Sequence, residues 1–277
     1  MGMRKVVRRG LRELLENLTE RVLDAQRVQS PTAVHQLRVA SRRLSGNLRT
    51  FRSILPKKIS RKIRRKLRAI RKATAELRIR DIVLEQMREA GLPSTNLLTE
   101  TLRQEREEAR RLLQDVLSRW QDKDYLGRWR AKLRACRPTK TSVSRLVEDV
   151  LRGFFDAGRK ASASGSPRQL HEFRLAAKQF RYMLELLQDF YGPELKKQLA
   201  SIRHVQNRLG EISDCSTSLK LLRDYSGINP SAEAQLERHL ERKLDESLTS
   251  FKQYWRQELD DPSQEAQWVQ FLCGRQC

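Results

Sequence analysis

The 277-residue sequence has few residues that break helices and no pattern that favours β-strands. It contains only 12 glycines and 8 prolines, whereas leucine, arginine, glutamate, alanine, lysine and glutamine dominate its composition. All six are good helix formers. No segment alternates β-branched and polar residues in the manner of an amphipathic strand. The sequence therefore predicts an all-α fold.

The sequence also lacks features typical of secreted, membrane-spanning and metal-binding proteins. No apolar run approaches the length of about 18 residues that a membrane span needs, and the N-terminal "MGMRKVVRRGLREL" contains no apolar signal-peptide segment. No CxxC occurs among the four cysteines, so we expect free thiols in a reducing cytoplasm for Cys136, Cys215, Cys273 and Cys277. No HxxxH or HExxH occurs either, so we expect no metal ion and no other cofactor.

Acidic residues are missing from a long part of the N-terminal half. Between Asp24 and Glu76 there is no Asp or Glu, but there are sixteen Lys or Arg. The first 138 residues have 36 basic and 15 acidic residues, a net charge of +21, out of +23 for the whole chain. Exposed helix faces usually mix signs, because opposite charges one turn apart stabilise a helix and like charges destabilise it. This single-sign region therefore predicts a polyanionic partner.

One segment at the start of this basic region occurs twice. The stretch "SPTAVHQLRVASRRL" (30–44) returns 136 residues later as "SPRQLHEFRLAAKQF" (166–180), with five identical positions. In both copies a Ser-Pro pair supplies a favourable N-cap and first helical residue. Apolar spacing and stop signals predict helices at about 7–25, 30–54, 57–90, 94–120, 143–161, 166–190, 194–225 and 231–259.

This order of helices predicts an internal duplication within a single domain that covers residues 1–277. Residues 1–121 would form the first four-helix repeat and residues 141–277 the second. The stretch 122–140 would be a partly helical connector between them.

Basic residues follow each repeated histidine at helical spacing. His35 is followed by Arg38, Arg42 and Arg49, and His171 by Arg174, Lys178 and Arg181. The next predicted helix has Arg64, Arg68 and Arg71 on one face, and a shift of 133 residues aligns Arg64 with Lys197 and Arg71 with His204, with Arg208 one turn further on. Charges about 5–6 Å apart in a line would suit a repeating polyanion. The histidines would either contact the anion or be polar residues at a helix seam.

These motifs resemble the CHAD domain, the conserved histidine α-helical domain. The resemblance covers essentially the whole chain and rests on a duplicated His-x-x-Arg-x-x-x-Arg-Arg-Leu pattern followed by Leu-Gly-x-x-x-Asp. His35, Arg38, Arg42 and Arg43 match the first copy, and His171, Arg174 and Lys178 match the second. "LGEISD" (209–214) fits the late motif, whereas "ELRIRD" (76–81) has Leu77 where glycine is usual. We interpret Asp81 and Asp214 as structural partners of basic side chains.

The resemblance implies two pseudo-symmetric four-helix bundles that face each other across a basic groove or pore. It also implies binding of inorganic polyphosphate, with a cytoplasmic location on polyphosphate granules. The basic residues named above would be the binding residues, and no catalytic residue is expected.

Two other functions compete with this hypothesis. The same charge would bind RNA or DNA, but aromatic residues make up only 6% of the sequence and neither basic helix face includes aromatic side chains that could stack on bases. An enzyme acting on phosphoanhydrides would need a carboxylate cluster, a nucleophile or a P-loop, and the acid-free stretch contains none of these. We therefore expect a binding protein without enzymatic activity.

Overall fold

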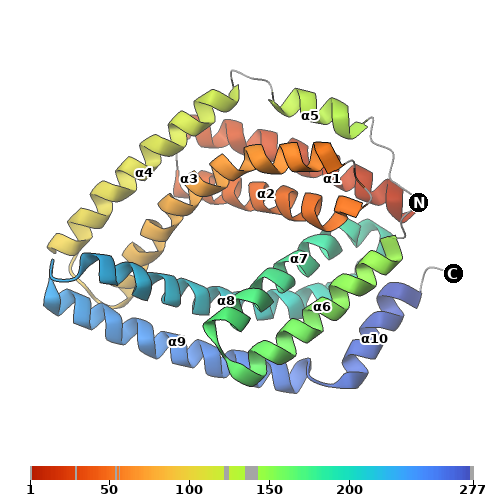
Figure 1. Cartoon of the computed structure of the whole chain (residues 1–277). Helices are drawn as coiled ribbons and strands as arrows, with labels where there is room; N and C mark the ends of the chain where they lie inside the picture. The colour runs from red at the N-terminus through yellow and green to blue at the C-terminus, as the bar shows by residue number, and fades with distance from the viewer. Residues whose placement is uncertain are drawn as a thin grey trace.

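The computed structural model describes residues 2–28, 30–53, 55, 57–121, 125–134 and 143–274. Throughout these residues the secondary structure is helical, as predicted, and no strand occurs in them. The α-helices are α1 (Met3–Arg27), α2 (Pro31–Thr50), α3 (Lys57–Glu89), α4 (Leu97–Gln121), α5 (Tyr125–Arg134), α6 (Val143–Ser164), α7 (Pro167–Tyr191), α8 (Lys196–Leu222), α9 (Pro230–Glu258) and α10 (Pro262–Cys273). In Figure 1, helices α2, α3, α7 and α8 surround the centre of the molecule, and α4 and α9 border it on the outside. None of the described helices is long and apolar enough to cross a membrane.

The two repeated Ser-Pro pairs start helices as predicted. The Ser30 hydroxyl accepts a hydrogen bond of 3.1 Å from the Ala33 amide, and the Ser166 hydroxyl accepts one of 3.4 Å from the Gln169 amide. In each case the following proline takes the first turn of the helix, where its missing amide proton costs nothing. The same device starts α2 and α7 at equivalent points of the two sequence copies.

The last helix, α10, was missed by the sequence prediction, which ended the final helix near Leu259. Asp261 caps α10 by accepting a hydrogen bond of 2.8 Å from the Ser263 amide, and Pro262 follows it. The cap pattern is present in the sequence, but α10 has only 12 residues and two fully buried ones, Trp268 and Leu272. With so few apolar positions, the sequence showed no helical periodicity that would predict a separate helix here.

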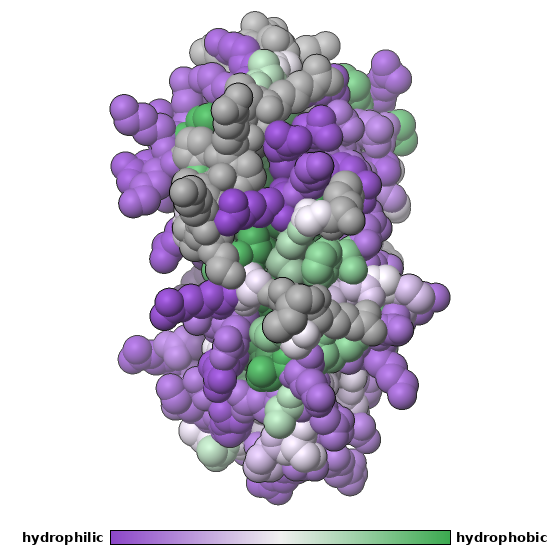
Figure 2. Space-filling model, turned by 90° about the vertical axis from the view of Figure 1, so that its right-hand side faces the viewer, coloured by the Kyte–Doolittle hydropathy of each residue, from purple (hydrophilic) through white to green (hydrophobic). Residues whose placement is uncertain are grey.

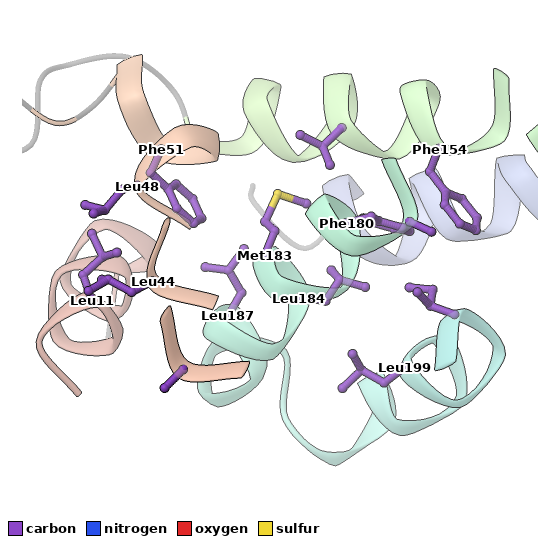
Figure 3. Close-up of a cluster of buried hydrophobic side chains, with 14 of the residues drawn as sticks. Leu11, Leu44, Leu48, Phe51, Phe154, Phe180, Met183, Leu184, Leu187 and Leu199 are labelled. Carbon is purple, nitrogen blue, oxygen red and sulfur yellow. The ribbon is translucent and has the colours of Figure 1, made fainter. Parts of the chain in front are cut away.

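The main hydrophobic core continues through α7. Figure 3 shows Phe180, Met183, Leu184 and Leu187 of α7 between side chains of α1 and α2 on one side and of α6 and α8 on the other. The labelled neighbours are Leu11, Leu44, Leu48, Phe51 (directly after α2), Phe154 and Leu199. Buried aliphatic and aromatic groups supply most of the stability of a helical domain. This core therefore fixes α2 and α7, the helices of the repeated motif, beside each other.

Small residues bring α7 close to the first two helices. A Cβ atom at Gly10 of α1 would lie 2.8 Å from the Leu186 side chain, and one at Gly46 of α2 would lie 3.0 Å from the Tyr182 ring. Both glycines thus leave room for the surface of α7, and the helix backbones approach more closely than larger residues would allow.

A second, smaller core joins the far ends of α3 and α4 to those of α8 and α9. It contains Val83, Met87, Leu98, Leu102, Cys215, Leu222, Tyr225, Leu236 and Leu240. Beside it, the Ser218 hydroxyl of α8 donates a hydrogen bond to the Gln86 side chain of α3. Helices α2 and α3 are thus held against the C-terminal helices at two separate places.

Several finer predictions have separate outcomes. On α4, Leu112 is 61% exposed and the neighbouring Leu113 is buried. Cys215 and Cys273 are free thiols, and Cys136 and Cys277 lie outside the described residues. Of the connector 122–140, residues 125–134 are described and form α5, whereas residues 122–124 and 135–140 lie outside the described residues. The internal duplication and the repeat boundaries stay predictions.

Most of the surface in Figure 2, which shows the right-hand side of Figure 1, is hydrophilic, with smaller hydrophobic areas near the middle of the view. Charged residues make up 33% of the sequence. Charged residues occur over most of the surface, so the surfaces of different helices differ in the sign and pairing of these charges rather than in their number.

Candidate functional site

Nine basic side chains from α2, α3 and α7 influence one another electrostatically and form what we call the basic cluster. Its members are Arg38, Arg42, Arg49, Arg64, Arg68, Arg71, Arg78, Arg174 and Lys178. Arg42 connects the cations of α2 and α7 with those of α3, because its charge acts on Arg38 and Lys178 and also on Arg71 of α3. The structure thus brings together eight of the residues predicted from the sequence, and adds Arg78.

Burial and mutual repulsion together disfavour the charged forms in the cluster. Burial, followed by the charges of Arg42, Arg174 and Arg78, lowers the pKa of Arg38 to about 10. Burial, followed by Arg174 and Arg42, lowers the pKa of Lys178 to about 6. A lysine with this pKa is mostly neutral at pH 7, although the arginines around it remain charged. The cluster therefore holds positive charge at a cost that a bound anion would relieve.

Asp214 of α8 is the acidic residue whose charge influences Arg38, Arg174 and Lys178 of this cluster. Burial raises its pKa, and the charges of Arg174, Arg78 and Lys178 oppose that rise. Its charge in turn favours the charged forms of Arg38, Arg174 and Lys178. One carboxylate cannot balance that many cations, so the interaction supports the sequence-based interpretation of Asp214 as a structural partner and leaves a positive excess.

Several nitrogen atoms of the cluster are buried without a hydrogen-bond partner among the described residues. They are the Nε atoms of Arg64, Arg71 and Arg174 and the Nζ atom of Lys178. Buried polar groups are normally satisfied, and each unsatisfied group costs about 1–3 kcal/mol. Such an unpaired donor, on a basic side chain surrounded by other basic side chains, is available to a hydrogen-bond acceptor of a bound anion.

A pocket of about 460 Å³ opens between α2, α3 and α7 at this place. Its basic lining residues are Arg42, Arg49, Arg71 and Lys178, and Glu172 is the acidic residue that lines it. Glu172 is itself paired with Arg168 at 3.0 Å. The pocket, which we call the basic pocket, thus has more positive than negative side chains in its wall.

The two repeated histidines lie at the edge of this region. His35 is exposed near the start of α2, and burial together with the charges of Arg78, Arg38 and Arg42 lowers its pKa. His171 is exposed at the start of α7 and lines a second pocket that it shares with Arg174. Neither histidine is a buried seam residue in the structure. Whether they contact an anion stays a prediction.

Other residues predicted as binding residues have partners within the chain. Arg43 and Arg181 lie 2.9 and 3.6 Å from the carboxylate of Glu185, which is 15% exposed and also lies 3.8 Å from Arg203. The sequence analysis missed Glu185, because nothing in the sequence shows that residues from α2, α7 and α8 meet at one carboxylate.

The residues of α8 that were aligned with α3 by the 133-residue shift lie in a different environment. His204 stacks on Tyr254 of α9 with ring centroids 4.0 Å apart, and Arg208 lies 3.3 Å from Glu211. Lys197 is exposed near the start of α8. Thus α3 places Arg64 and Arg71 near α2, whereas α8 places His204 against α9. The 133-residue shift pairs positions with similar residue types, but the helices that pack around each position determine what its side chain contacts.

The two aspartates of the late motif also differ. Asp81 of α3 forms an ion pair of 2.6 Å with Arg106 of α4, as expected for a structural partner. Leu77, which replaces the usual glycine of the motif, is buried and α3 continues through it. Arg103 and Arg110 of α4 pair with glutamates three residues before them, so the mixed charges of α4 neutralise one another.

Among the described residues, no group of three or more His, Cys, Asp or Glu side chains lies together in a way that could hold a metal ion. The arrangement that the structure does present is a set of fixed cations with unpaired donors. Such a set can bind an anion with several negatively charged oxygens, since arginine offers paired donors to phosphate oxygens.

Comparisons with known proteins give a family match and similar folds. The family model of the CHAD domain matches residues 5–223. Among solved structures, PptA from Streptomyces chartreusis superposes with a TM-score of 0.69 at 18% sequence identity, covering 93% of this chain and all of the other. The crystal structure of the CHAD domain from the plant Ricinus communis superposes with a TM-score of 0.68 at 18% identity, covering 92% of each chain. No curated protein sequence matches the chain.

Proposed function

The chain belongs to the CHAD domain family, and from this membership and the basic cluster we propose that it binds inorganic polyphosphate. The single observation that carries the proposal is a set of buried side-chain nitrogen atoms without hydrogen-bond partners, on Arg71, Arg174 and Lys178, within the basic cluster. A helical protein gains nothing from burying like charges together, because each loses its hydration and repels the others. A chain of phosphates would supply acceptors and negative charge along the whole cluster.

The basic pocket and the basic cluster would hold the polymer between α2, α3 and α7. We propose that this region corresponds to the basic groove that the sequence resemblance implies. Binding would release counterions from the polymer, so its affinity should fall steeply as the salt concentration rises. We propose a binding protein rather than an enzyme, located in the cytoplasm on polyphosphate granules.

The alternative partner is nucleic acid. The cluster would bind its phosphates as well, but base recognition in single strands relies on aromatic side chains that stack on the bases. Tyr182 is the aromatic residue that lines the basic pocket, and it is buried. The lack of an exposed stacking surface there favours a polymer without bases.

A double variant tests the proposal. Arg38→Gln with Arg174→Gln should weaken polyphosphate binding and flatten its salt dependence, with the slope of log K against log salt reduced by about 1–2, since each lost contact removes about 0.7. Arg238→Gln with Arg256→Gln is the matched control, because both arginines are exposed on α9 and the change in net charge is the same.

Binding is measured by isothermal titration calorimetry at several salt concentrations, together with the melting temperature of each variant. The cluster variant should melt close to the wild type, because the lost repulsion among the cations offsets the lost attraction between Asp214 and these two arginines. A competition at equal phosphate concentration separates the two partners. If RNA or DNA displaces polyphosphate, or if the control variant loses as much affinity as the cluster variant, the proposal is wrong.

A further inference from the structure

The exposed side of α3 carries a second set of basic residues that the proposed site does not use. We call this set the outer stripe, and its members are Lys58, Arg61, Lys62, Arg65 and Lys72. All five are exposed, and none has an ion pair or hydrogen bond among the described residues. At 1.5 Å per residue, the stripe runs for about 21 Å along the helix.

Several exposed arginines elsewhere on this protein pair with carboxylates one turn away. Examples are Arg152 with Glu148 at 2.7 Å, Arg168 with Glu172 at 3.0 Å and Arg242 with Glu246 at 2.7 Å. Residues 57–72, in contrast, contain ten Lys or Arg and no Asp or Glu. The outer stripe is therefore not the ordinary charged surface of this molecule.

The stripe destabilises the helix that carries it. Lys58 and Lys62, and likewise Arg61 and Arg65, are like charges one turn apart, and each such pair costs a few tenths of a kcal/mol. Lys58 lies in the first turn of α3, at the positive end of the helix dipole, and no acidic residue of that turn offsets its charge. A buried apolar face that includes Ile63, Leu67 and Ile70 keeps the helix in place despite this cost.

Positive charge continues around α3 from the basic cluster to the outer stripe. Arg64 and Arg71 of the cluster lie next to the buried face, and Arg68, which is exposed, lies between them and the stripe on the helix surface. A flexible polyanion held in the cluster could thus continue onto the outer stripe without crossing an acidic or apolar surface.

We propose that the outer stripe is a second polyphosphate-binding site, which takes the part of a long chain that extends beyond the basic cluster. This inference rests on the proposed function. It assigns preference for long chains to the stripe and binding of short chains to the cluster. No aromatic residue lies between residues 57 and 72, so the stripe offers phosphate contacts and nothing that would stack on a nucleic-acid base.

A fivefold variant with every stripe member changed to glutamine tests the inference. Glutamine has a helix propensity close to those of lysine and arginine, so α3 should be preserved. The matched control removes five exposed basic residues from other helices and leaves the same net charge; its changes are Arg119→Gln, Lys160→Gln, Arg223→Gln, Arg238→Gln and Arg256→Gln. The probes are tripolyphosphate and a long-chain polyphosphate, each titrated at several salt concentrations.

The stripe variant should bind tripolyphosphate within about twofold of the wild type. For the long chain, the slope of log K against log salt should fall by about 3–4, since each of five lost contacts removes about 0.7. The control should change that slope by less than about 1. The variant without ligand should also unfold at a higher temperature than the wild type.

Three results would overturn the inference. One is an unchanged salt slope for the long chain in the stripe variant, and another is an equal loss in the control, which would mean that net charge alone decides. The third is a stripe variant that loses affinity for duplex DNA but keeps its affinity for the long chain. If the wild-type protein binds neither tripolyphosphate nor the long chain, the proposed function itself fails, and the inference with it.

Discussion

Lys178 should make polyphosphate binding depend on pH. In the free protein, burial, followed by the charges of Arg174 and Arg42, lowers the pKa of this lysine to about 6, so that only about 1% of it is protonated at pH 8. A chain of phosphates in the basic pocket would replace that repulsion with attraction and return the pKa toward its ordinary value of 10.5. Binding at pH 8 should therefore take up about one proton per site.

The sign of the effect follows from this change in protonation. Between pH 6 and 10.5 the bound form of Lys178 holds the proton and the free form does not, so affinity should rise as the pH falls. The expected change is about tenfold per pH unit between about pH 7 and 9, with a plateau below about pH 6. Arg38, with a pKa of about 10, stays charged through this window.

Isothermal titration calorimetry in two buffers with different ionisation enthalpies measures the proton uptake directly. Lys178→Met should remove about one proton and the pH slope, whereas Lys160→Met, a change at an exposed lysine on α6, should keep both. Because His35 and His171 also lie near the cluster, the titrations are repeated with both histidines changed to glutamine. Equal proton uptake by the wild type and Lys178→Met would refute the reasoning.

The protonation of Lys178 should also make the free energy of unfolding depend on pH. The pKa of Lys178 is depressed in the folded state, so the unfolded chain holds the proton between pH 6 and 10.5 and the folded protein releases it. The free energy of unfolding should therefore increase with pH across this range, and Lys178→Met should flatten the increase. Urea denaturation at several pH values measures this directly.

The remaining predictions concern packing, ion pairs and the histidines. Glu185→Gln should lower the free energy of unfolding by about 2 kcal/mol, since it leaves Arg43 and Arg181 with buried nitrogen atoms and no carboxylate. Glu246→Gln, at an exposed ion pair on α9, should change the free energy of unfolding by less than about 0.5 kcal/mol. Equal effects of the two variants would contradict the role assigned to Glu185. Gly158→Ala should cost about 1–3 kcal/mol, because its Cβ would lie 1.9 Å from the Trp255 ring, whereas Gly153→Ala in the same helix meets nothing within 4 Å and should stabilise the protein by about 0.5–1 kcal/mol in thermal denaturation. If the histidines contact the anion, changing His35 and His171 to glutamine should reduce the gain in affinity between about pH 8 and 6; an unchanged profile in the Lys178→Met background would assign them no contact.

Helical periodicity and cap signals were sufficient to predict nine of the ten described α-helices, if the helical part of the connector is counted. Ser30 and Ser166 act as caps because a side-chain hydroxyl next to a proline satisfies an amide of the first turn whatever surrounds the helix. The prediction failed for α10, where burial of Trp268 and Leu272 against the rest of the molecule, rather than a strong local pattern, holds the segment.

The candidate site was partly readable in the same way. Residues three, four or seven positions apart share a helix face, so the rows from Arg38 to Arg49 and from Arg64 to Arg71 could be identified without a structure. Arg78 continues the second row by two further turns, but it lies after Glu76, beyond the acid-free stretch that drew attention to its neighbours. The sequence gave no signal that Glu185 also meets Arg43 of α2 and Arg203 of α8, nor of which cations Asp214 meets.

The amino-acid sequence alone shows that the chain is helical and where most of its helices begin and end. It also shows that one half carries almost all of the excess charge and that one motif occurs twice. These properties depend on neighbours within a turn or two. Only the tertiary structure decided which cations lose their solvent and which find a carboxylate: Lys178 and Arg174 are buried among arginines, Arg43 and Arg181 share Glu185, and His204 stacks on Tyr254. The physical reason is that the free energy of a charge depends on burial and on neighbours from other helices, and these are set when α7 packs against α1 and α2.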